Sequence, residues 1–272
     1  MAARINRDGK LKGQVALVTG ASRGIGEAIA VRLAMEGAHV IGTARTVHEG
    51  ESTYSGTLAG VVARITAAGG LASYLQADLG RAEDRARLAA EALSRHGHVD
   101  ILVNNAAALM GGPFVALSEK RLKTIFEINV FAPFDLAQRL APQMSERGRG
   151  AIVNISSAAS IHAVAPFEPR QESGILYPMT KAALERFTTV LAQELYDDGV
   201  SVNALSPGFI DTPGNRRAIM GDDTPLEGTQ SATIPAEAAY QLVIGDPKVI
   251  TGRLAEAKLL LEELGVEPQP LV

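Results

Sequence analysis

The chain has 272 residues, of which 46 % are hydrophobic and 21 % are charged, a composition typical of globular rather than disordered proteins. Its net charge of −4 without a basic block argues against a general nucleic-acid-binding surface, and the absence of cysteine excludes disulfides, thiolate metal sites and cysteine nucleophiles. Residues 1–8 lack the apolar core of a signal peptide, and no apolar run approaches the ~20 residues that a membrane helix requires, so we expect a cytoplasmic protein without membrane contact.

Short apolar runs alternate with longer helical patterns along the chain. Residues 15–19 are nearly all apolar, which predicts a strand that is buried on both faces. Residues 22–36 follow as a predicted helix that ends at Gly37. The alternation continues with predicted strands at residues 39–43, 71–76, 99–104, 151–156 and 200–205, and with helical patterns that include residues 81–95, 118–140 and 180–196. This alternation predicts an α/β fold, a single-domain Rossmann-like doubly wound parallel sheet over residues 1–272 with helices on both faces.

Polar segments rich in glycine or proline interrupt this rhythm at residues 47–57, 162–174 and 213–235, the last of which resembles a mobile flap. Long loops within a compact domain are usually functional or disordered. We therefore expect substrate loops at about residues 109–114, 162–176 and 213–235. The apolar residues of these segments line a pocket or merely anchor the loops: Leu109, Met110, Val164, Phe167, Ile219 and Met220.

A glycine motif, TGASRGIG, occupies residues 19–26 between the first strand and the first helix. Glycines permit a tight turn and let backbone N–H groups approach a pyrophosphate. The start of the helix behind them supplies unpaired donors and the positive end of the helix dipole. This context favours a dinucleotide site, built on Gly20, Gly24 and Gly26, over an ordinary glycine-rich turn.

Two arginines indicate which dinucleotide binds. A cofactor without a 2′-phosphate usually meets an acidic residue at the end of the second strand, but that strand is followed here by Arg45 and has no Asp or Glu at its end. Arg45, and Arg23 in the glycine loop, are charged donors suited to a phosphate. The alternative is two solvated surface arginines. We predict NADP(H).

Tyr177 and Lys181 are four residues apart, so they share a face if a helix runs through them. They follow the predicted strand that ends at Ser156, with Ser157 next to it. Reduction of a carbonyl requires a proton donor at the oxygen, and a tyrosine serves if its pKa of ~10 is lowered toward neutrality. A neighbouring ammonium favours the phenolate, and a serine hydroxyl can hold the substrate oxygen. The pattern predicts a proton-transfer site beside a nicotinamide.

Taken together, these motifs resemble the short-chain dehydrogenase/reductase family over about residues 11–252. The matching segments stand in the family's order: residues 19–26, Asn104-Asn105-Ala106, Asn129, Ser157, Tyr177, Lys181 and Ser206-Pro207-Gly208. The resemblance implies that Ser157 orients the carbonyl and that Tyr177 transfers the proton. It also implies that Lys181 binds the nicotinamide ribose and lowers the tyrosine pKa, and that Asn129 supports a water relay.

The same resemblance implies the cofactor contacts. Asp78, followed by Leu79, resembles the residue beside adenine, although a role as a strand-end or helix-cap residue stays open for Asp78. Asn105 resembles the strand-end asparagine near the cofactor, and Ile210 and Thr212 match positions that contact the carboxamide and phosphates. The predicted cofactor-binding residues are Gly20, Ser22, Arg23, Gly24, Ile25, Gly26, Arg45, Asp78, Leu79, Asn105, Tyr177, Lys181, Pro207, Gly208, Ile210 and Thr212.

Three features depart from the family pattern. Ala107 stands where the family usually has glycine, and the separation of 20 residues between Ser157 and Tyr177 is longer than usual, which indicates an insertion beside the substrate pocket. Residues 254–264 predict a C-terminal helical tail where the family commonly has a strand. We still expect at least a homodimer, or a homotetramer, because the long helices predicted at residues 118–140 and 180–196 can pair between subunits.

The sequence thus predicts an NADP(H)-dependent oxidoreductase that acts on a small or medium, mostly apolar carbonyl or alcohol. A 3-oxoacyl-thioester reductase, acting on acyl-carrier-protein or CoA substrates, is the alternative within the same class, and a non-catalytic NADP(H)-binding sensor is the alternative from another class. We expect no metal site, because His96 and His98 lie in a polar turn without an obvious third ligand. His162 lies near the expected pocket, where it contacts substrate or solvent.

Overall fold

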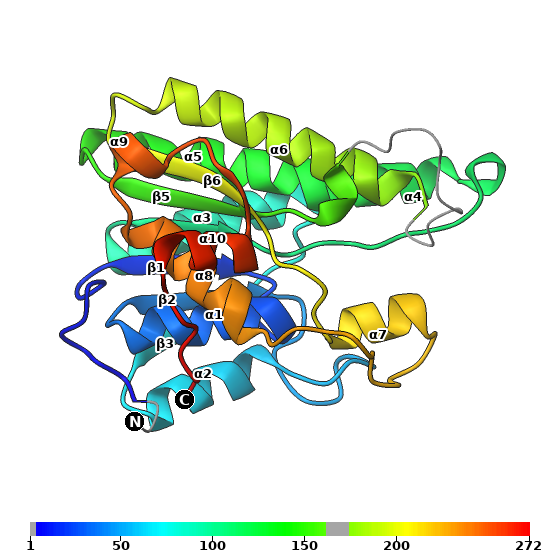
Figure 1. Ribbon diagram of the computed structural model, residues 1–272, viewed down its shortest axis with the longest axis horizontal. Coiled ribbons are helices and arrows are strands. Elements are labelled where there is room, and N and C mark those ends of the chain that lie inside the picture. The colour runs from blue at the N-terminus through cyan, green and yellow to red at the C-terminus, as the bar shows by residue number, and fades with distance from the viewer. Residues whose placement is uncertain (1–3, 162–173) are drawn as a thin grey trace.

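The computed structural model describes residues 4–161 and 174–272 and contains a seven-stranded sheet (Figure 1). Neighbouring strands are parallel throughout, in the order β3-β2-β1-β4-β5-β6-β7. The strands are β1 (Val15–Thr19), β2 (His39–Ala44), β3 (Leu71–Gln76), β4 (Ile101–Asn104), β5 (Gly150–Ile155), β6 (Val200–Ser206) and β7 (Leu254–Glu256). The predicted Rossmann-like α/β fold is confirmed.

Helices cover both faces of the sheet (Figure 1). The apolar core on one face is built with α1 (Gly24–Met35), α2 (Leu58–Ala67), α8 (Thr233–Ile244) and α10 (Ala257–Leu264). The core on the other face is built with α3 (Ala82–His96), α5 (Ala132–Glu146) and α6 (Leu176–Glu194). The shorter helical segments are α4 (Glu119–Phe126), a π-helical turn (Glu127–Phe131), α7 (Pro213–Ile219), α9 (Pro247–Ile250) and two 3₁₀ turns (Phe114–Ala116 and Ala158–Ser160). In the part of the chain that the structure describes, no helix is long and apolar enough to cross a bilayer.

The strand order places the candidate site. The order reverses at β1, which pairs with both β2 and β4, and ligands of open α/β sheets bind beyond the carboxyl ends of the strands at such a point. Gly20, Asn105, Ser157 and Pro207 follow the carboxyl ends of β1, β4, β5 and β6. Because parallel strands end at the same edge, the topology brings these four segments together.

A buried polar ladder fixes α6 against the centre of the sheet. Asn104 of β4 donates to the Asn154 side chain of β5 (2.9 Å), and Asn154 donates to the Thr188 hydroxyl of α6 (2.9 Å). Thr188 in turn donates to the Leu184 carbonyl. Each buried amide and hydroxyl finds a partner, which offsets the cost of burying it, and the ladder sets the register of α6 over β5.

Two expectations are corrected by the structure. The predicted C-terminal helix begins only at Ala257, because Leu254–Glu256 pair in parallel with β6 as the edge strand β7. The predicted flap is not irregular throughout: α7 occupies Pro213–Ile219, where the Thr212 hydroxyl caps the helix by accepting from the Asn215 N–H. The other predicted strands lie within two residues of the observed ones, and α6 begins at Leu176, so Tyr177 lies in its first turn.

Candidate active site

The glycine motif forms a tight cradle at the start of α1. A Cβ atom on Gly26 would lie 2.3 Å from the Gly20 carbonyl oxygen and 2.4 Å from Asn105 Nδ2, so only glycine fits there. Gly20 and Gly24 have φ angles of +64° and +58°, in the left-handed region that favours glycine. Arg23, the N-cap of α1, makes no side-chain cap. The first-turn N–H groups therefore lack a side-chain acceptor, as a pyrophosphate cradle requires.

Thr19 and Asn105 join the cradle to the end of β4. The Asn105 amide donates to the carbonyl oxygens of Thr19 (2.8 Å) and Gly20 (3.2 Å). The Thr19 hydroxyl donates to Val103 and accepts from the N–H groups of Asn105 and Ala106. Asn105, which the sequence placed near the cofactor, thus supports the shape of the glycine loop.

The two predicted phosphate-binding arginines lie close enough to repel each other. Burial lowers the pKa of Arg23, and the positive charge of Arg45 adds to that lowering. Arg23 is held by the 47–57 loop: it donates to the Gly56 carbonyl (2.9 Å) and lies over the Tyr54 ring, with its Cζ 5.3 Å from the ring centroid. Arg45 is exposed, and within the described chain its guanidinium donates no hydrogen bond. An anion between these like charges would relieve their repulsion.

A cavity of about 280 Å³ lies at the carboxyl ends of β2 and β3, lined by Arg45, Gln76, Ala77, Asp78, Asp84 and Arg87. Asp78 Oδ1 accepts from the Gly80 N–H, and its own N–H donates to Asp84, so Asp78 also shapes the turn after β3. The Leu79 side chain is buried in the core and its carbonyl accepts from Arg85. A cofactor here would therefore meet Asp78 rather than the Leu79 side chain.

The structure brings Ser157, Tyr177 and Lys181 together at the start of α6. Lys181 Nζ lies 5.5 Å from the centroid of the Tyr177 ring and donates to the Ile155 carbonyl at the end of β5 (2.7 Å). Ser157 caps the 3₁₀ turn after β5 by accepting from the Ala159 N–H, and its hydroxyl lies near enough to the Tyr177 phenol to act on the pKa of that group. A proton donor, a hydroxyl and an ammonium thus share one location, as carbonyl reduction requires.

Burial dominates the pKa values of this group. It lowers the pKa of Lys181 from 10.5 to about 8, and the negative charge of Glu185 opposes that lowering. It raises the pKa of Tyr177, and the nearby Ser157 hydroxyl only opposes that rise. The Lys181 ammonium donates to the Ile155 carbonyl, and the lowering of the tyrosine pKa by Lys181 stays a prediction. A protonated phenol is nevertheless the state that donates to a carbonyl oxygen.

Asn129 lies in the π-helical turn and ties the segment after β4 to α6. Its Oδ1 accepts from the Ala108 N–H (2.7 Å), and its Nδ2 donates to the Ala108 carbonyl and the Thr180 hydroxyl (both 3.0 Å). These bonds use both N–H groups of the side-chain amide and one acceptor site of its oxygen. The part of Asn129 in a water relay stays a prediction, and π-helical turns often occur at functional sites.

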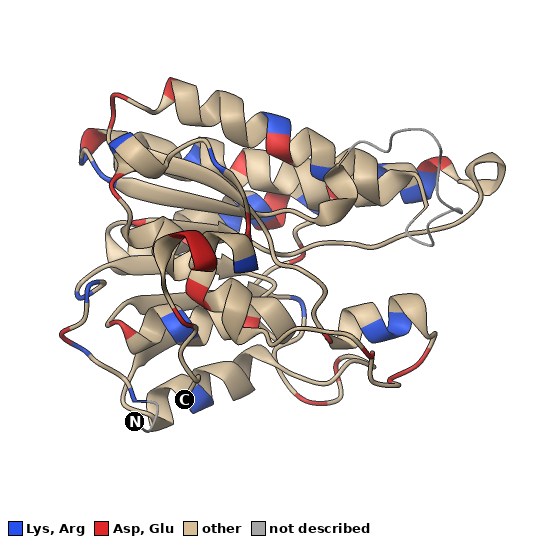
Figure 2. Cartoon of the chain, in the orientation of Figure 1, with Lys and Arg blue, Asp and Glu red and all other residues tan. Residues whose placement is uncertain are grey.

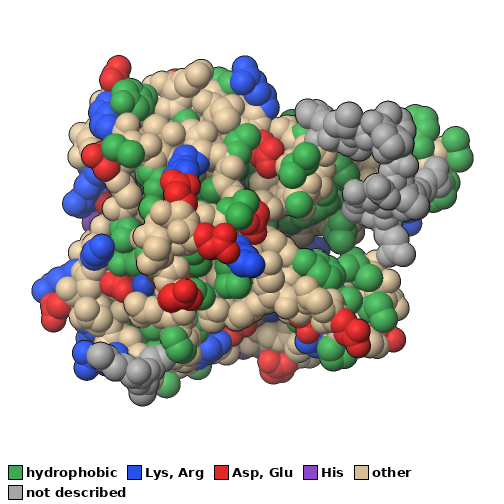
Figure 3. All heavy atoms as spheres, viewed as in Figure 1, with side chains coloured by type: hydrophobic (Ala, Val, Ile, Leu, Met, Phe, Trp, Pro, Cys, Tyr) green, Lys and Arg blue, Asp and Glu red, His purple; other side chains and the backbone are tan. Residues whose placement is uncertain are grey.

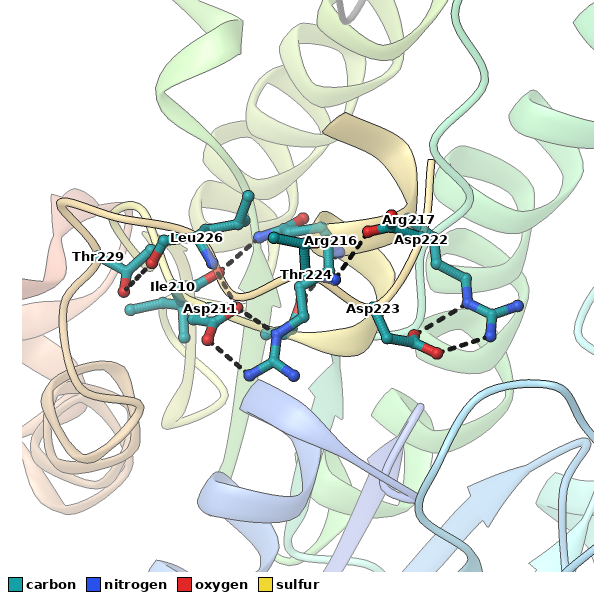
Figure 4. Close-up of polar contacts among 11 residues, drawn as sticks. Ile210, Asp211, Arg216, Arg217, Asp222, Asp223, Thr224, Leu226 and Thr229 are labelled. Atoms are coloured by element: carbon teal, nitrogen blue, oxygen red, sulfur yellow. Dashed lines mark hydrogen bonds and ion pairs between the residues drawn. The ribbon is translucent and has the colours of Figure 1, made fainter. Parts of the chain in front are cut away.

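The base of the flap lies against the cradle. A Cβ atom on Gly24 would lie 3.0 Å from Thr212 Cγ2, and Gly208 has a φ of +80° beside the Gln230 side chain. Pro207 and Ile210 are buried. Ion pairs brace the flap itself (Figure 4): Arg216 with Asp211 (2.6 Å) and Arg217 with Asp223 (2.9 Å). Figure 2 shows these two arginines as the blue segments of α7.

Two residues that contribute to the site were not singled out from the sequence. Glu185 accepts hydrogen bonds from Ser156 and Ser160, which flank Ser157 (both 2.6 Å). Its position four residues after Lys181 was a usable signal, since it shares the helix face of Tyr177. Arg85 links the Leu79 carbonyl to Glu127 of the π-helical turn and to Asp135 of α5. No sequence pattern marks these contacts.

Other candidate residues lie apart from this group. His96 packs edge-on against His39, and His98 pairs with Asp100; in the described ranges, no group of three His, Asp or Glu side chains is placed to hold a metal ion. Ile219 and Met220 are exposed on the α7 side, where Figure 3 shows hydrophobic side chains together. Leu109 is also exposed and Met110 is half-buried. The remaining predicted pocket residues lie outside the described residues: His162, Val164 and Phe167.

Comparison with known proteins identifies relatives over most of the chain. The family model described as short chain dehydrogenase matches residues 14–221. An uncharacterized oxidoreductase of Methylorubrum extorquens is 34 % identical over 260 residues, which cover 91 % of this chain and 97 % of the relative. Dehydrogenase/reductase SDR family member 4 of Homo sapiens is 37 % identical over 78 % of this chain and 71 % of its own length.

Two further similarities bear on cofactor and substrate. A metagenomic short-chain oxidoreductase, solved in complex with NADP, superimposes with a TM-score of 0.72 at 33 % identity and covers 90 % of this chain and 97 % of its own. The ketoacyl reductase HetN of a Nostoc species is 35 % identical over 75 % of this chain and 66 % of its own length.

Proposed function

The chain belongs to the short-chain dehydrogenase/reductase family, and we propose that it is an NADP(H)-dependent oxidoreductase that interconverts a carbonyl and an alcohol. The observation that carries this proposal is the grouping of Ser157, Tyr177 and Lys181 at the strand edge that also holds the glycine cradle. Strands from residues 15 to 256 share one sheet, and we propose that the whole chain acts as one domain.

Each residue has a role that its position supports. The cradle of Gly20, Gly24 and Gly26 would hold the pyrophosphate, and NADP(H) would supply or accept the hydride. The Ser157 hydroxyl would hold the substrate oxygen, while Tyr177 gives its phenolic proton to that oxygen during reduction or takes it back during oxidation. The Lys181 ammonium would bind the ribose and stabilise negative charge that develops on the phenol oxygen.

The choice of NADP(H) over NAD(H) rests on the end of β2. Arg45 borders the 280 Å³ cavity with its guanidinium exposed, and Arg23 lies near enough for the two charges to interact. A 2′-phosphate between them would gain charge-assisted hydrogen bonds. The related structure with bound NADP supports the same choice.

We propose a small or medium, mostly apolar ketone or alcohol as substrate, because the exposed side chains near the flap include Ile219 and Met220. The similarity to a ketoacyl reductase keeps a 3-oxoacyl thioester as the second candidate. Rates of NADPH oxidation with simple ketones and with acetoacetyl-CoA separate the two substrate classes.

The test of the proposed function combines binding and turnover. We expect NADPH to bind more tightly than NADH, and Arg45→Ala to weaken NADPH binding about tenfold or more, since a charged hydrogen bond contributes ~1.5–3 kcal/mol. Arg87→Ala is the matched control, because Arg87 lines the same cavity but is already paired with Asp84 and Glu91. Equal affinity of the wild type for both cofactors would overturn the choice of NADP(H).

Turnover distinguishes an enzyme from a sensor. Tyr177→Phe should lower the rate of carbonyl reduction by a factor of about 100 or more, the range that general acid catalysis contributes, with NADPH binding unchanged. A wild type that binds NADPH but oxidises it with none of the carbonyl substrates would instead favour the sensor.

A further inference from the structure

A carboxylate lies directly behind the turn that carries Ser157. Glu185 Oε1 accepts hydrogen bonds from the hydroxyls of Ser156 and Ser160, each at 2.6 Å. Ser156 and Ser160 are both buried, with 2 % and 8 % of their surfaces exposed. Hydrogen bonds to a charged acceptor are stronger than neutral ones, and more so away from water. One side chain of α6 therefore clamps the turn from both sides of Ser157.

The same hydrogen bonds join the turn to α6. The Ser160 oxygen also lies 2.8 Å from the Ser157 carbonyl oxygen, so its one hydrogen is shared between that carbonyl and Glu185. Just before the turn, the Ile155 carbonyl accepts from Lys181. Lys181 and Glu185, one helical turn apart on α6, thus hydrogen-bond to the last residue of β5 and to the turn that follows it.

The same carboxylate acts on Lys181 through its charge. Burial disfavours the Lys181 ammonium, and the negative charge of Glu185 favours it. Elements packed against α6 also carry charged side chains that have to be considered beside Lys181. Of these, Glu127 of the π-helical turn pairs with Arg85. The charged residues of α4 are exposed: Glu119, Lys120, Arg121 and Lys123.

We propose that Glu185 is a positioning residue of this site, which holds Ser157 at its place beside Tyr177 and presents its negative charge one helical turn from Lys181. The inference rests on the proposed carbonyl reduction, for which both effects matter. A displaced Ser157 would misplace the substrate oxygen, and misplacement by ~1 Å can lower a rate about 100-fold. A neutral Lys181 would leave the charge on the phenol oxygen unstabilised.

The decisive variant is Glu185→Gln, which keeps the size and an acceptor oxygen but removes the charge. Its matched control is Glu194→Gln, the same change at an exposed position on the same helix. We expect Glu185→Gln to lower kcat about tenfold at neutral pH with the Kd for NADPH within about twofold of the wild type. The loss of activity at high pH should begin at a lower pH, because Lys181 loses its proton more easily.

A second measurement does not depend on turnover. The seven lysines of the chain can be labelled at Cε with ¹³C and titrated by NMR, with Lys181→Arg to assign the signal. We expect the midpoint of Lys181, near pH 8 in the wild type, to fall by at least about half a unit in Glu185→Gln, as loss of a neighbouring opposite charge requires. Glu194→Gln should leave the midpoint unchanged.

The outcomes separate the two proposals. An unchanged Lys181 midpoint together with a kcat equal to that of Glu194→Gln would overturn the role of Glu185, whatever the substrate. A uniformly lower kcat with no shift of the midpoint or of the pH profile would also overturn it, since it would mark a purely structural contact. A wild type without carbonyl reduction, or a fully active Tyr177→Phe variant, would instead overturn the proposed function, and the NMR titration would still report whether Glu185 acts on Lys181.

Discussion

The burial of Lys181 in the candidate site is expected to cost the folded protein stability. Its side chain is almost fully buried, with a single hydrogen bond to the Ile155 carbonyl. Burial lowers the pKa of Lys181 from 10.5 to about 8, so the folded state binds this proton more weakly than the unfolded chain does. At neutral pH the folded state must hold an ammonium that water would solvate better.

Replacing this lysine by an apolar residue should therefore stabilise the protein while it removes activity. We expect Lys181→Met to raise the free energy of unfolding at pH 7 by about 2 kcal/mol, given ~1.36 kcal/mol per unit of pKa difference and some loss of the hydrogen bond. Between about pH 8 and pH 10.5 the unfolded chain binds more protons than the folded protein. The wild type should therefore gain stability as the pH rises through that window, and the difference in stability between Lys181→Met and the wild type should shrink.

Urea denaturation at pH 7 and pH 9.5 measures this difference. Lys258→Met, at an exposed lysine of α10, should change the free energy of unfolding by less than about 0.5 kcal/mol at either pH. A Lys181→Met protein that is less stable than the wild type at pH 7 would refute the expectation.

The sequence predicts the identity of this group better than its internal geometry. Helical spacing suffices to place Tyr177 and Lys181 on one face, and the end of β5 brings Ser157 to them. The direction of the Lys181 ammonium and the burial of Tyr177 depend on packing across three elements, which no local pattern records. The spacing of Glu185 from Lys181 placed it on the same helix face, but its partners, two serines 29 and 25 residues earlier in the chain, are set by packing.

At the scale of elements, the 47–57 loop and the flap form a bridge beside the cradle. Arg217 of α7 donates to the Thr53 carbonyl (2.8 Å) and lies over the Tyr54 ring, with its Cζ 4.8 Å from the centroid. Arg23 of the glycine loop lies over the same ring. Two segments about 160 residues apart in the sequence thus meet at Tyr54. Opening of the flap requires these contacts to break.

This bridge should slow the release of the cofactor. We expect Arg217→Ala to speed dissociation of NADPH about tenfold, because it removes a hydrogen bond and a cation–π contact that together contribute ~1–2 kcal/mol. Stopped-flow displacement of NADPH, followed by its fluorescence, measures the rate. Asp223→Asn is the control, since it weakens the ion pair within the flap and keeps the contacts of Arg217 with Thr53 and Tyr54. Equal release rates in the two variants would show that the bridge does not restrain the flap.

Elements with long periodic patterns were predicted well, and short ones were not. The strands β1 and β3 were predicted with their observed bounds, β1 from a nearly continuous apolar run and β3 from its place in the alternation of strands and helices. The three residues of β7 carry too few positions for an alternating pattern, and their assignment depends on pairing with β6. The helix α7 depends on the cap at Thr212 and on Pro213 in its first turn, which a composition rich in glycine, proline and aspartate conceals.

At the scale of the whole molecule, apolar side chains remain exposed on the two long helices of one face. Phe131 and Phe134, at the start of α5, and Met179 and Val190, on α6, each expose more than two fifths of their surface. The rings of Phe134 and Phe187 lie 5.4 Å apart and join the two helices. Large apolar side chains that stay exposed on neighbouring helices are typical of an interaction site. It supports the expectation of a homodimer, in which the same face of each copy would meet around a two-fold axis.

We predict a homodimer that buries this face. Replacing both Phe134 and Val190 by glutamate would place negative charges opposite each other across the two-fold axis, and each charge would also lose its water on association. The dimer of this variant should therefore dissociate at concentrations where the wild type is associated. Light scattering coupled to size-exclusion chromatography, over a tenfold range of concentration, measures the mass. Val249→Glu is the control, because Val249 is 80 % exposed but lies on α9. A monomeric wild type, or a double variant that keeps the wild-type mass, would exclude this face as the interface.

Since α6 also carries Tyr177, Lys181 and Glu185, dissociation should also lower kcat if the partner subunit holds this helix in place.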